Sequence, residues 1–132
     1  HNINQQAITL CRDKGILINA VDNPPNCDFF VPALLRRDSL AIAISTEGKS
    51  PLLARKVKEK LEGIISEEYG ELVEVLGRLR REVIDNIPDI NDRKELFEKL
   101  VNSDILKLLE TGKREKVEGL ISNVCSPYRI KP

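Results

Sequence analysis

The sequence predicts an α+β protein with three successive parts. A helix, a glycine and an apolar run follow one another at the amino end, which is typical of the end of an α/β unit. Two short apolar runs then predict a β-hairpin, and the chain after Ser50 has helical periodicity throughout. We therefore expect the end of an α/β domain in residues 1–28, a hairpin and helix in residues 29–66, and an all-helical domain in residues 67–132.

The first helix is expected from about Asn4 to Lys14. Ile8 and Cys11 lie on the same side of such a helix, so both should face inward. Gly15 is well suited to end it, because glycine adopts the left-handed conformation common after a helix. A strand is expected to begin directly after this glycine.

This predicted strand is the apolar run Ile16 to Val21, which Pro24 and Pro25 prevent from continuing. Asp22 therefore holds a carboxylate at the carboxyl end of a strand, where α/β proteins usually bind ligands and carry catalytic groups. The alternative is an Asx turn, in which the Asp22 side chain only satisfies neighbouring backbone N–H groups.

The hairpin is predicted from the runs Phe29 to Arg36 and Leu40 to Ser45. The second run is apolar on both faces, which is typical of a strand covered on both sides by helices or by another subunit. A lone hairpin is marginally stable in water. We therefore expect a homodimer in which this segment takes part.

Helical signals begin at Ser50, a good N-cap residue, and at Pro51, which suits the first helical position. Leu53, Val57, Leu61 and either Ile64 or Ile65 recur at helical spacing and should form the inward face of this helix.

A second helix is predicted from a seam of apolar residues that ends where Pro88 breaks the pattern. The seam could pair within the chain or across a dimer, and it consists of Tyr69, Leu72, Leu76, Leu79 and Val83. Three shorter helices should follow, at Asp92 to Val101, Asp104 to Glu110 and Lys113 to Val124.

Composition excludes several classes of function. The 21 basic residues balance the 21 acidic ones, whereas a nucleic-acid-binding protein would normally have a basic excess. No apolar run approaches the roughly 20 residues that span a bilayer. Cys11, Cys27 and Cys125 lie far apart and form no metal-binding motif. The sequence therefore predicts a soluble cytoplasmic protein with reduced thiols, no metal site, and no nucleic-acid or membrane partner.

The loop of residues 45–50 precedes a helix amino terminus, where free N–H groups and the helix dipole favour an anion. A P-loop is excluded, because its first glycine would fall at Ala43. Residues 36–60 also hold seven basic residues against three acidic ones, which could steer an anion or simply be solvated. An ordinary capped loop is the alternative to an anion site, whose candidate residues are Thr46, Gly48, Lys49, Ser50 and Arg55.

The run from Ile18 to Arg55 resembles the dehydrogenase module of siroheme synthases, the precorrin-2 dehydrogenase and sirohydrochlorin ferrochelatase family. The matching residues are Asn19, Val21, Asp22, Pro24, Phe29, Val31, Pro32, Ala43 to Pro51, Ala54 and Arg55. The resemblance extends over essentially the whole chain. It implies that residues 1–28 end a Rossmann-like NAD-binding domain and that the middle segment forms a two-fold dimer.

The resemblance also implies roles for single residues. Asp22 matches the acid/base residue of the family, which oxidises precorrin-2 to sirohydrochlorin with NAD. The anion at the loop would be one or more peripheral carboxylates of the tetrapyrrole, and Asn19 would contribute to cofactor binding. This chain departs from the commonest family pattern at Thr46, where Ser is frequent, and at Glu47, where a small residue is common.

A glycine-rich dinucleotide-binding loop, which the family carries upstream, does not occur in these 132 residues. The chain also starts at His1 and contains no Met. We therefore expect a fragment that is inactive alone and that acts with an upstream nucleotide-binding half. Iron insertion is a second candidate activity of the parent enzyme. The alternative is a non-catalytic dimerisation or tetrapyrrole-binding module.

Overall fold

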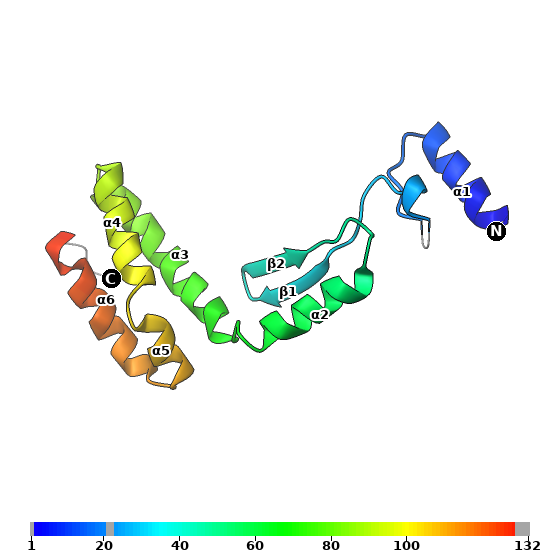
Figure 1. Ribbon diagram of the computed structural model, residues 1–132. Coiled ribbons are helices and arrows are strands. Elements are labelled where there is room, and N and C mark those ends of the chain that lie inside the picture. Colours follow the sequence, from blue (N-terminus) through cyan, green and yellow to red (C-terminus); the bar gives the residue numbers. More distant parts are fainter. Residues whose placement is uncertain (1, 21–22, 129–132) are drawn as a thin grey trace. The chain divides into compact units, whose positions relative to one another are not determined.

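The computed structural model describes residues 2–20 and 23–128 (Figure 1). These residues form six α-helices, three short 3-10 helices and one two-stranded sheet. The α+β class expected from the sequence is confirmed. Within these described ranges, no helix is long and apolar enough to cross a membrane.

Two compact units divide the chain. The amino-terminal unit comprises residues 1–35 and 42–63, and the helical unit comprises residues 36–41 and 64–132. The tip of the hairpin thus belongs to the helical unit, while the rest of the hairpin belongs to the amino-terminal unit.

The first helix, α1 (Asn2–Asp13), starts two residues earlier than expected and ends one residue earlier. Gly15 has a φ of +65°, the left-handed conformation that glycine adopts without steric cost. Ile8 is buried and Cys11 is half-buried, so the predicted inward face of the helix is confirmed.

The strand expected at residues 16–21 is not formed over its described part, residues 16–20, and this prediction was wrong. A strand needs a neighbour, and the one sheet among the described residues is the hairpin. The segment is instead held by Asp28, whose Oδ2 accepts from the Ile18 N–H at 2.9 Å and whose N–H donates to the Ile18 carbonyl at 2.8 Å. A 3-10 helix, η1 (Pro24–Asn26), lies between these partners in sequence.

The hairpin consists of β1 (Ala33–Arg37) and β2 (Leu40–Ile44), and its prediction is confirmed with a shorter first strand. The first strand starts after Pro32, which has no N–H to donate to a sheet. At the turn, Asp38 has a φ of +47°.

Only one face of the hairpin is covered. Leu35 is fully buried, whereas its neighbours Leu34 and Arg36 are exposed on the opposite face, together with Ala41 and Ala43 of β2. The expectation that both faces of the hairpin are covered is therefore not met within this chain.

Helix α2 (Pro51–Glu62) begins as predicted, with the Ser50 hydroxyl accepting from the Leu53 N–H at 3.3 Å. Its buried residue is Ala54, whereas Leu53 is 56% exposed. The predicted inward position of Leu53 was therefore wrong. Val57 and Leu61 are half-buried, so the inward face runs through Ala54, Val57 and Leu61 and leaves Leu53 outside it.

The helical unit contains α3 (Glu68–Asn86), α4 (Ile90–Val101), α5 (Ile105–Glu110) and α6 (Val117–Cys125). Figure 1 shows these helices beside one another, and α3 contacts both α4 and α5. Short 3-10 helices, η2 (Arg114–Lys116) and η3 (Ser126–Tyr128), flank α6. The helix break predicted at Pro88 is confirmed between α3 and α4.

The apolar seam of α3 packs inside this unit, which settles the choice between pairing within the chain and pairing across a dimer. Leu72, Leu79 and Val83 are buried, and Leu76 is packed against them. The seam residues share one core with α4, α5 and α6, whose buried members are Leu96, Leu100, Ile105, Leu109, Val117, Ile121 and Cys125. The suggestion that the seam offers a surface for a second subunit was therefore wrong.

Candidate functional site

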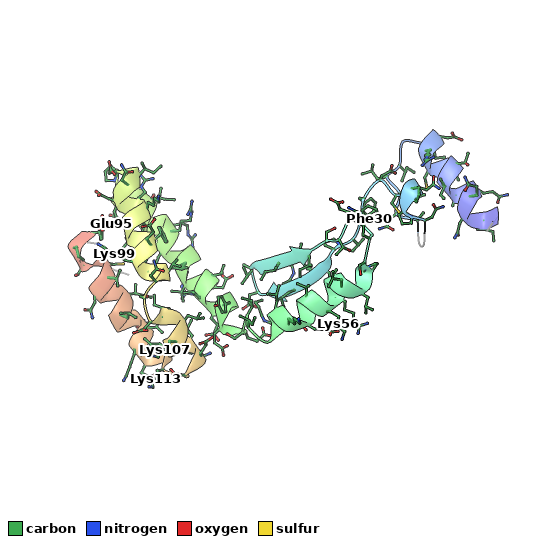
Figure 2. The ribbon with its side chains drawn as sticks, in the orientation of Figure 1. Phe30, Lys56, Glu95, Lys99, Lys107 and Lys113 are labelled. Carbon is green, nitrogen blue, oxygen red and sulfur yellow. The ribbon has the colours of Figure 1, made fainter. Side chains whose placement is uncertain are left out.

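A pocket of about 340 Å³ lies in the amino-terminal unit, between the hairpin and the start of α2. Phe30 is labelled near this place in Figure 2. The pocket is lined by Asn19, Phe30, Val31, Pro32, Ala33, Ile44, Ser45, Thr46, Gly48, Pro51 and Ala54.

The loop before α2 brings two predicted site residues, Thr46 and Gly48, to this pocket. The Thr46 hydroxyl accepts from the Ser50 N–H at 3.1 Å, and the Thr46 carbonyl accepts from the Lys49 N–H at 2.9 Å. Glu47 and Gly48 both have positive φ, at +53° and +75°. The loop is therefore a tight, hydrogen-bonded turn that leads into the helix.

Phe30 lies directly against Gly48. A Cβ atom on Gly48 would lie 2.5 Å from the nearest carbon of the Phe30 ring. The ring can approach the backbone this closely only because glycine has no side chain. Phe30 therefore forms an apolar wall beside the loop.

The chemistry of the lining is mostly apolar, with three polar side chains at Asn19, Ser45 and Thr46. Pockets for small molecules usually combine apolar walls with a few placed polar groups that fix orientation. This lining suits a largely apolar molecule that carries hydrogen-bonding groups at its edge.

The charged residues around the pocket are largely paired with one another. Lys49 forms an ion pair with Glu47 at 3.1 Å, and Arg55 forms one with Glu59 at 3.2 Å. Lys56 also binds Glu59, and this hydrogen bond is the main cause that lowers the pKa of the Glu59 carboxyl. These exposed pairs neutralise part of the local basic excess that the sequence shows.

Cys27 holds the segment that leads away from the pocket. Its Sγ accepts from the Ala20 N–H at 3.3 Å and lies 3.3 Å from the Ala20 carbonyl and 3.4 Å from the Asn23 carbonyl. Asn26 is bound in turn by Arg12 at 2.8 Å. These contacts fix the backbone on both sides of Val21 and Asp22, and Asp22 itself lies outside the described residues.

Of the residues predicted from the sequence, the pocket brings together Asn19, Thr46 and Gly48. Ser50 caps α2, while Lys49 and Arg55 are exposed and do not line the pocket. Sequence reasoning missed the role of Phe30 as a pocket wall. The signal in the sequence that could have found it is the run of aromatic and apolar residues from Phe29 to Val31, directly before Pro32.

Groups of three or more His, Cys, Asp or Glu side chains that could hold a metal ion are absent from the described part of the chain. Cys11, Cys27 and Cys125 are free thiols.

Family models match three successive parts of the chain. Residues 1–33 match a putative NAD(P)-binding family, and residues 37–64 match the central part of the sirohaem biosynthesis protein. Residues 68–123 match the sirohaem synthase dimerisation region. Together these matches cover almost the whole sequence.

The chain is also similar in sequence to known siroheme synthases. The chain is 36% identical over 116 residues to a siroheme synthase of Psychrobacter sp. (strain PRwf-1), a match that covers 88% of this chain and 24% of that protein. It is 32% identical over 123 residues to a siroheme synthase of Pseudoalteromonas translucida, covering 93% of this chain and 26% of the relative. The chain thus spans about a quarter of the length of these relatives.

Among solved structures, the chain is similar to SirC, a precorrin-2 dehydrogenase, with a TM-score of 0.59 and 26% sequence identity. The match covers 73% of this chain and 47% of that one. Sequence families, relatives and structure agree, and the chain belongs to the siroheme synthase family.

Proposed function

We propose that this chain is part of a precorrin-2 dehydrogenase, which oxidises precorrin-2 to sirohydrochlorin with NAD during siroheme biosynthesis. The observation that carries this proposal is the pocket that brings Asn19, Thr46 and Gly48 together. The likeness to a precorrin-2 dehydrogenase supports the reaction, and the siroheme synthase relatives support the pathway.

Asp22 is the proposed base. The oxidation transfers a hydride to NAD and releases a proton, and a positioned carboxylate accelerates the loss of that proton. This role is supported by the contacts of the Cys27 Sγ with the backbone of Ala20 and Asn23, which hold the chain before and after residues 21–22.

The tetrapyrrole is proposed to lie in the pocket with its macrocycle against the apolar wall that includes Phe30. Its peripheral carboxylates would meet the start of α2, where N–H groups and the helix dipole favour an anion. The residues assigned to this role are Thr46, Gly48, Lys49, Ser50 and Arg55.

NAD is supported for the parent family by the putative NAD(P)-binding family that matches residues 1–33. Asn19, which lines the pocket, is the proposed cofactor contact within this chain. Because the printed sequence has no glycine-rich loop, the 132-residue chain alone should not bind NAD measurably. Isothermal titration calorimetry tests this, and binding in the micromolar range would contradict an upstream cofactor loop.

Substitution of Asp22 tests the reaction in a protein that joins this segment to its nucleotide-binding half. Asp22→Asn removes the base with little change of shape, so turnover should fall on the order of 100-fold or more. Asp13→Asn, at an exposed position in α1, is the matched control and should retain full turnover. Near-normal turnover of Asp22→Asn would refute the assignment.

The three parts of the chain keep their proposed roles. Residues 1–28 end the nucleotide-binding domain, residues 29–66 bind substrate and take part in dimerisation, and residues 67–132 form a helical domain. A homodimer is supported by the dimerisation family that matches residues 68–123. The free thiols favour a reducing compartment such as the cytoplasm. Iron insertion into sirohydrochlorin is a second candidate activity of the parent protein.

A non-catalytic dimerisation or tetrapyrrole-binding module is the second candidate, and the apolar pocket with its three polar side chains supports the binding role. The two functions are separated by adding precorrin-2 and NAD to the natural gene product, and by measuring tetrapyrrole binding and oxidation separately. Tetrapyrrole binding without any precorrin-2 oxidation would favour the module.

A further inference from the structure

Asn19 lines the pocket of the amino-terminal unit, and both of its neighbours in the chain are tied in place. Before it, the Ile18 N–H donates to the Asp28 carboxylate at 2.9 Å, and the Ile18 carbonyl accepts from the Asp28 N–H at 2.8 Å. After it, the Ala20 N–H donates to the Cys27 Sγ at 3.3 Å. The adjacent residues Cys27 and Asp28 therefore form a clasp that holds the backbone on both sides of Asn19.

The Cys27 thiol can use both its donor and its acceptor in this clasp. A thiol has one S–H to donate and a sulfur that accepts. While the sulfur accepts from the Ala20 N–H, the S–H can donate to the carbonyl of Ala20 or of Asn23, at 3.3 and 3.4 Å. The Ala20 carbonyl also accepts from the Asn23 N–H at 3.2 Å. An apolar side chain in place of Cys27 would therefore remove the acceptor of the Ala20 N–H.

The side chain of Asn19 is left with hydrogen-bonding capacity for an occupant of the pocket. Its Oδ1 lies 3.9 Å from the Cys27 Sγ, whereas its Nδ2 group has no hydrogen-bond partner within residues 2–20 and 23–128. Small-molecule sites use a few placed polar groups to fix the orientation of what they bind. The clasp determines where the Nδ2 group of Asn19 is placed.

We infer that Cys27 and Asp28 are positioning residues, which hold Asn19 in the orientation that binds NAD. The inference rests on the proposed function, in which Asn19 is the cofactor contact of this chain. Neither Cys27 nor Asp28 is among the described residues that line the pocket, so both act through Asn19. A group that is ordered before its ligand arrives binds more tightly, because less conformational entropy is lost on binding.

The clasp is tested by amide hydrogen exchange in the 132-residue chain, which requires no activity. Cys27→Ala removes the acceptor of the Ala20 N–H, so this amide should exchange roughly tenfold faster. Cys27→Ser keeps a donor and an acceptor and should exchange at nearly the original rate.

Cys11→Ala is the matched control for this measurement. Cys11 is a half-buried free thiol of the same unit, and its side chain has no hydrogen bond within the described part of the chain. The Ala20 amide should therefore exchange at the original rate in Cys11→Ala. Equal exchange of this amide in Cys27→Ala and Cys11→Ala would overturn the inference.

The role in cofactor binding is tested with precorrin-2 and NAD in the natural gene product. Asp28→Ala loosens the backbone beside Asn19 and removes no group that is proposed to react, so the KM for NAD should rise about fivefold with little change in kcat. Asp28→Asn keeps an acceptor oxygen and should restore the original KM. Cys27→Ala should raise the KM for NAD as well. In an Asn19→Ala background both alanine substitutions should add little to the KM, because the group through which they act is gone.

The outcomes separate this inference from the proposed function. If Asn19→Ala leaves the KM for NAD unchanged, the proposed cofactor contact is wrong and the inference fails with it. If Asn19→Ala raises this KM while Cys27→Ala and Asp28→Ala do not, the cofactor contact stands and the inference is overturned. An effect of Asp28→Ala that persists in the Asn19→Ala background would also overturn it. Circular dichroism checks the helix content of each variant, and if one of the two alanine variants unfolds, the other decides under the same criteria.

Discussion

Gly70 in the first turn of α3 packs directly against Asp38 at the turn of the hairpin. A Cβ atom on Gly70 would lie 2.7 Å from a carboxylate oxygen of Asp38 and 2.9 Å from the Arg37 carbonyl oxygen. The second of these neighbours is backbone, which cannot move aside as a flexible side chain can. Arg37 strengthens the same contact by donating to the Ile65 carbonyl at 2.9 Å and pairing with Glu67 at 3.0 Å.

A Gly70→Ala substitution should therefore push the hairpin turn at Asp38 away from α3. We expect Gly70→Ala to destabilise the helical unit by about 1 to 3 kcal/mol, the usual cost of overpacking. Gly77→Ala in the same helix has no neighbour within 4 Å of the new Cβ and should stabilise it by roughly 0.5 to 1 kcal/mol. Urea unfolding followed by circular dichroism measures both, and equal effects of the two substitutions would contradict the close contact.

The wall that Phe30 forms beside Gly48 predicts a second pair of glycine substitutions. Gly15→Ala places a side chain at positive φ in open space and should cost about 1 to 2 kcal/mol from backbone strain alone. Gly48→Ala adds a collision with the Phe30 ring to the same strain, so its cost should be larger. Thermal unfolding of the two variants gives the comparison. A smaller loss for Gly48→Ala would show that the ring does not rest on the loop.

The buried thiol of Cys125 predicts a dependence of stability on alkaline pH. Burial, and secondly the charge of Glu82, raises the pKa of Cys125 above its ordinary value of 9.0. A raised pKa means that the unfolded chain loses this proton at lower pH than the folded one. The contribution of the buried, protonated Cys125 thiol to the free energy of unfolding is therefore fully present below pH 9.0. It is lost as the pH rises through the pKa of the thiol in the folded state.

The free energy of unfolding should fall above pH 9.0 more steeply for the original chain than for Cys125→Ala. Urea titrations at several pH values measure this difference, and identical pH slopes would contradict it. Cys125 should also react with a thiol reagent more slowly than Cys11 and Cys27, which are only half-buried.

Local signals in the sequence were sufficient to predict much of this fold. Ser50 and Pro51 start α2, Gly15 follows α1, and Pro88 separates α3 from α4. Each of these signals acts through hydrogen bonds or dihedral angles within a few residues, so no knowledge of tertiary contacts is required.

Other features depend on which surfaces meet, and these could not be predicted. The composition of the run from Ile16 predicts a strand, but Ile18 in this run bonds to the side chain and backbone of Asp28 instead. Leu53 shares a helical period with Val57, yet Ala54 is the residue that is buried. The same limit applies to the candidate site, where Thr46 and Gly48 were predicted but the wall formed by Phe30 was not.

The amino-terminal unit has a small core, so its melting temperature should depend on whether a ligand is bound to it. Among the described residues of this unit, the buried hydrophobic side chains are Ile8, Leu35 and Ala54, whereas twelve buried residues form the core of the helical unit. A unit with so little internal stabilisation responds strongly to any molecule that binds only its folded form, which contributes about 2.7 kcal/mol at 100 times its dissociation constant. The midpoint of its melting transition should therefore rise with ligand concentration, so calorimetric scans can serve as a screen for the molecules that this unit evolved to hold.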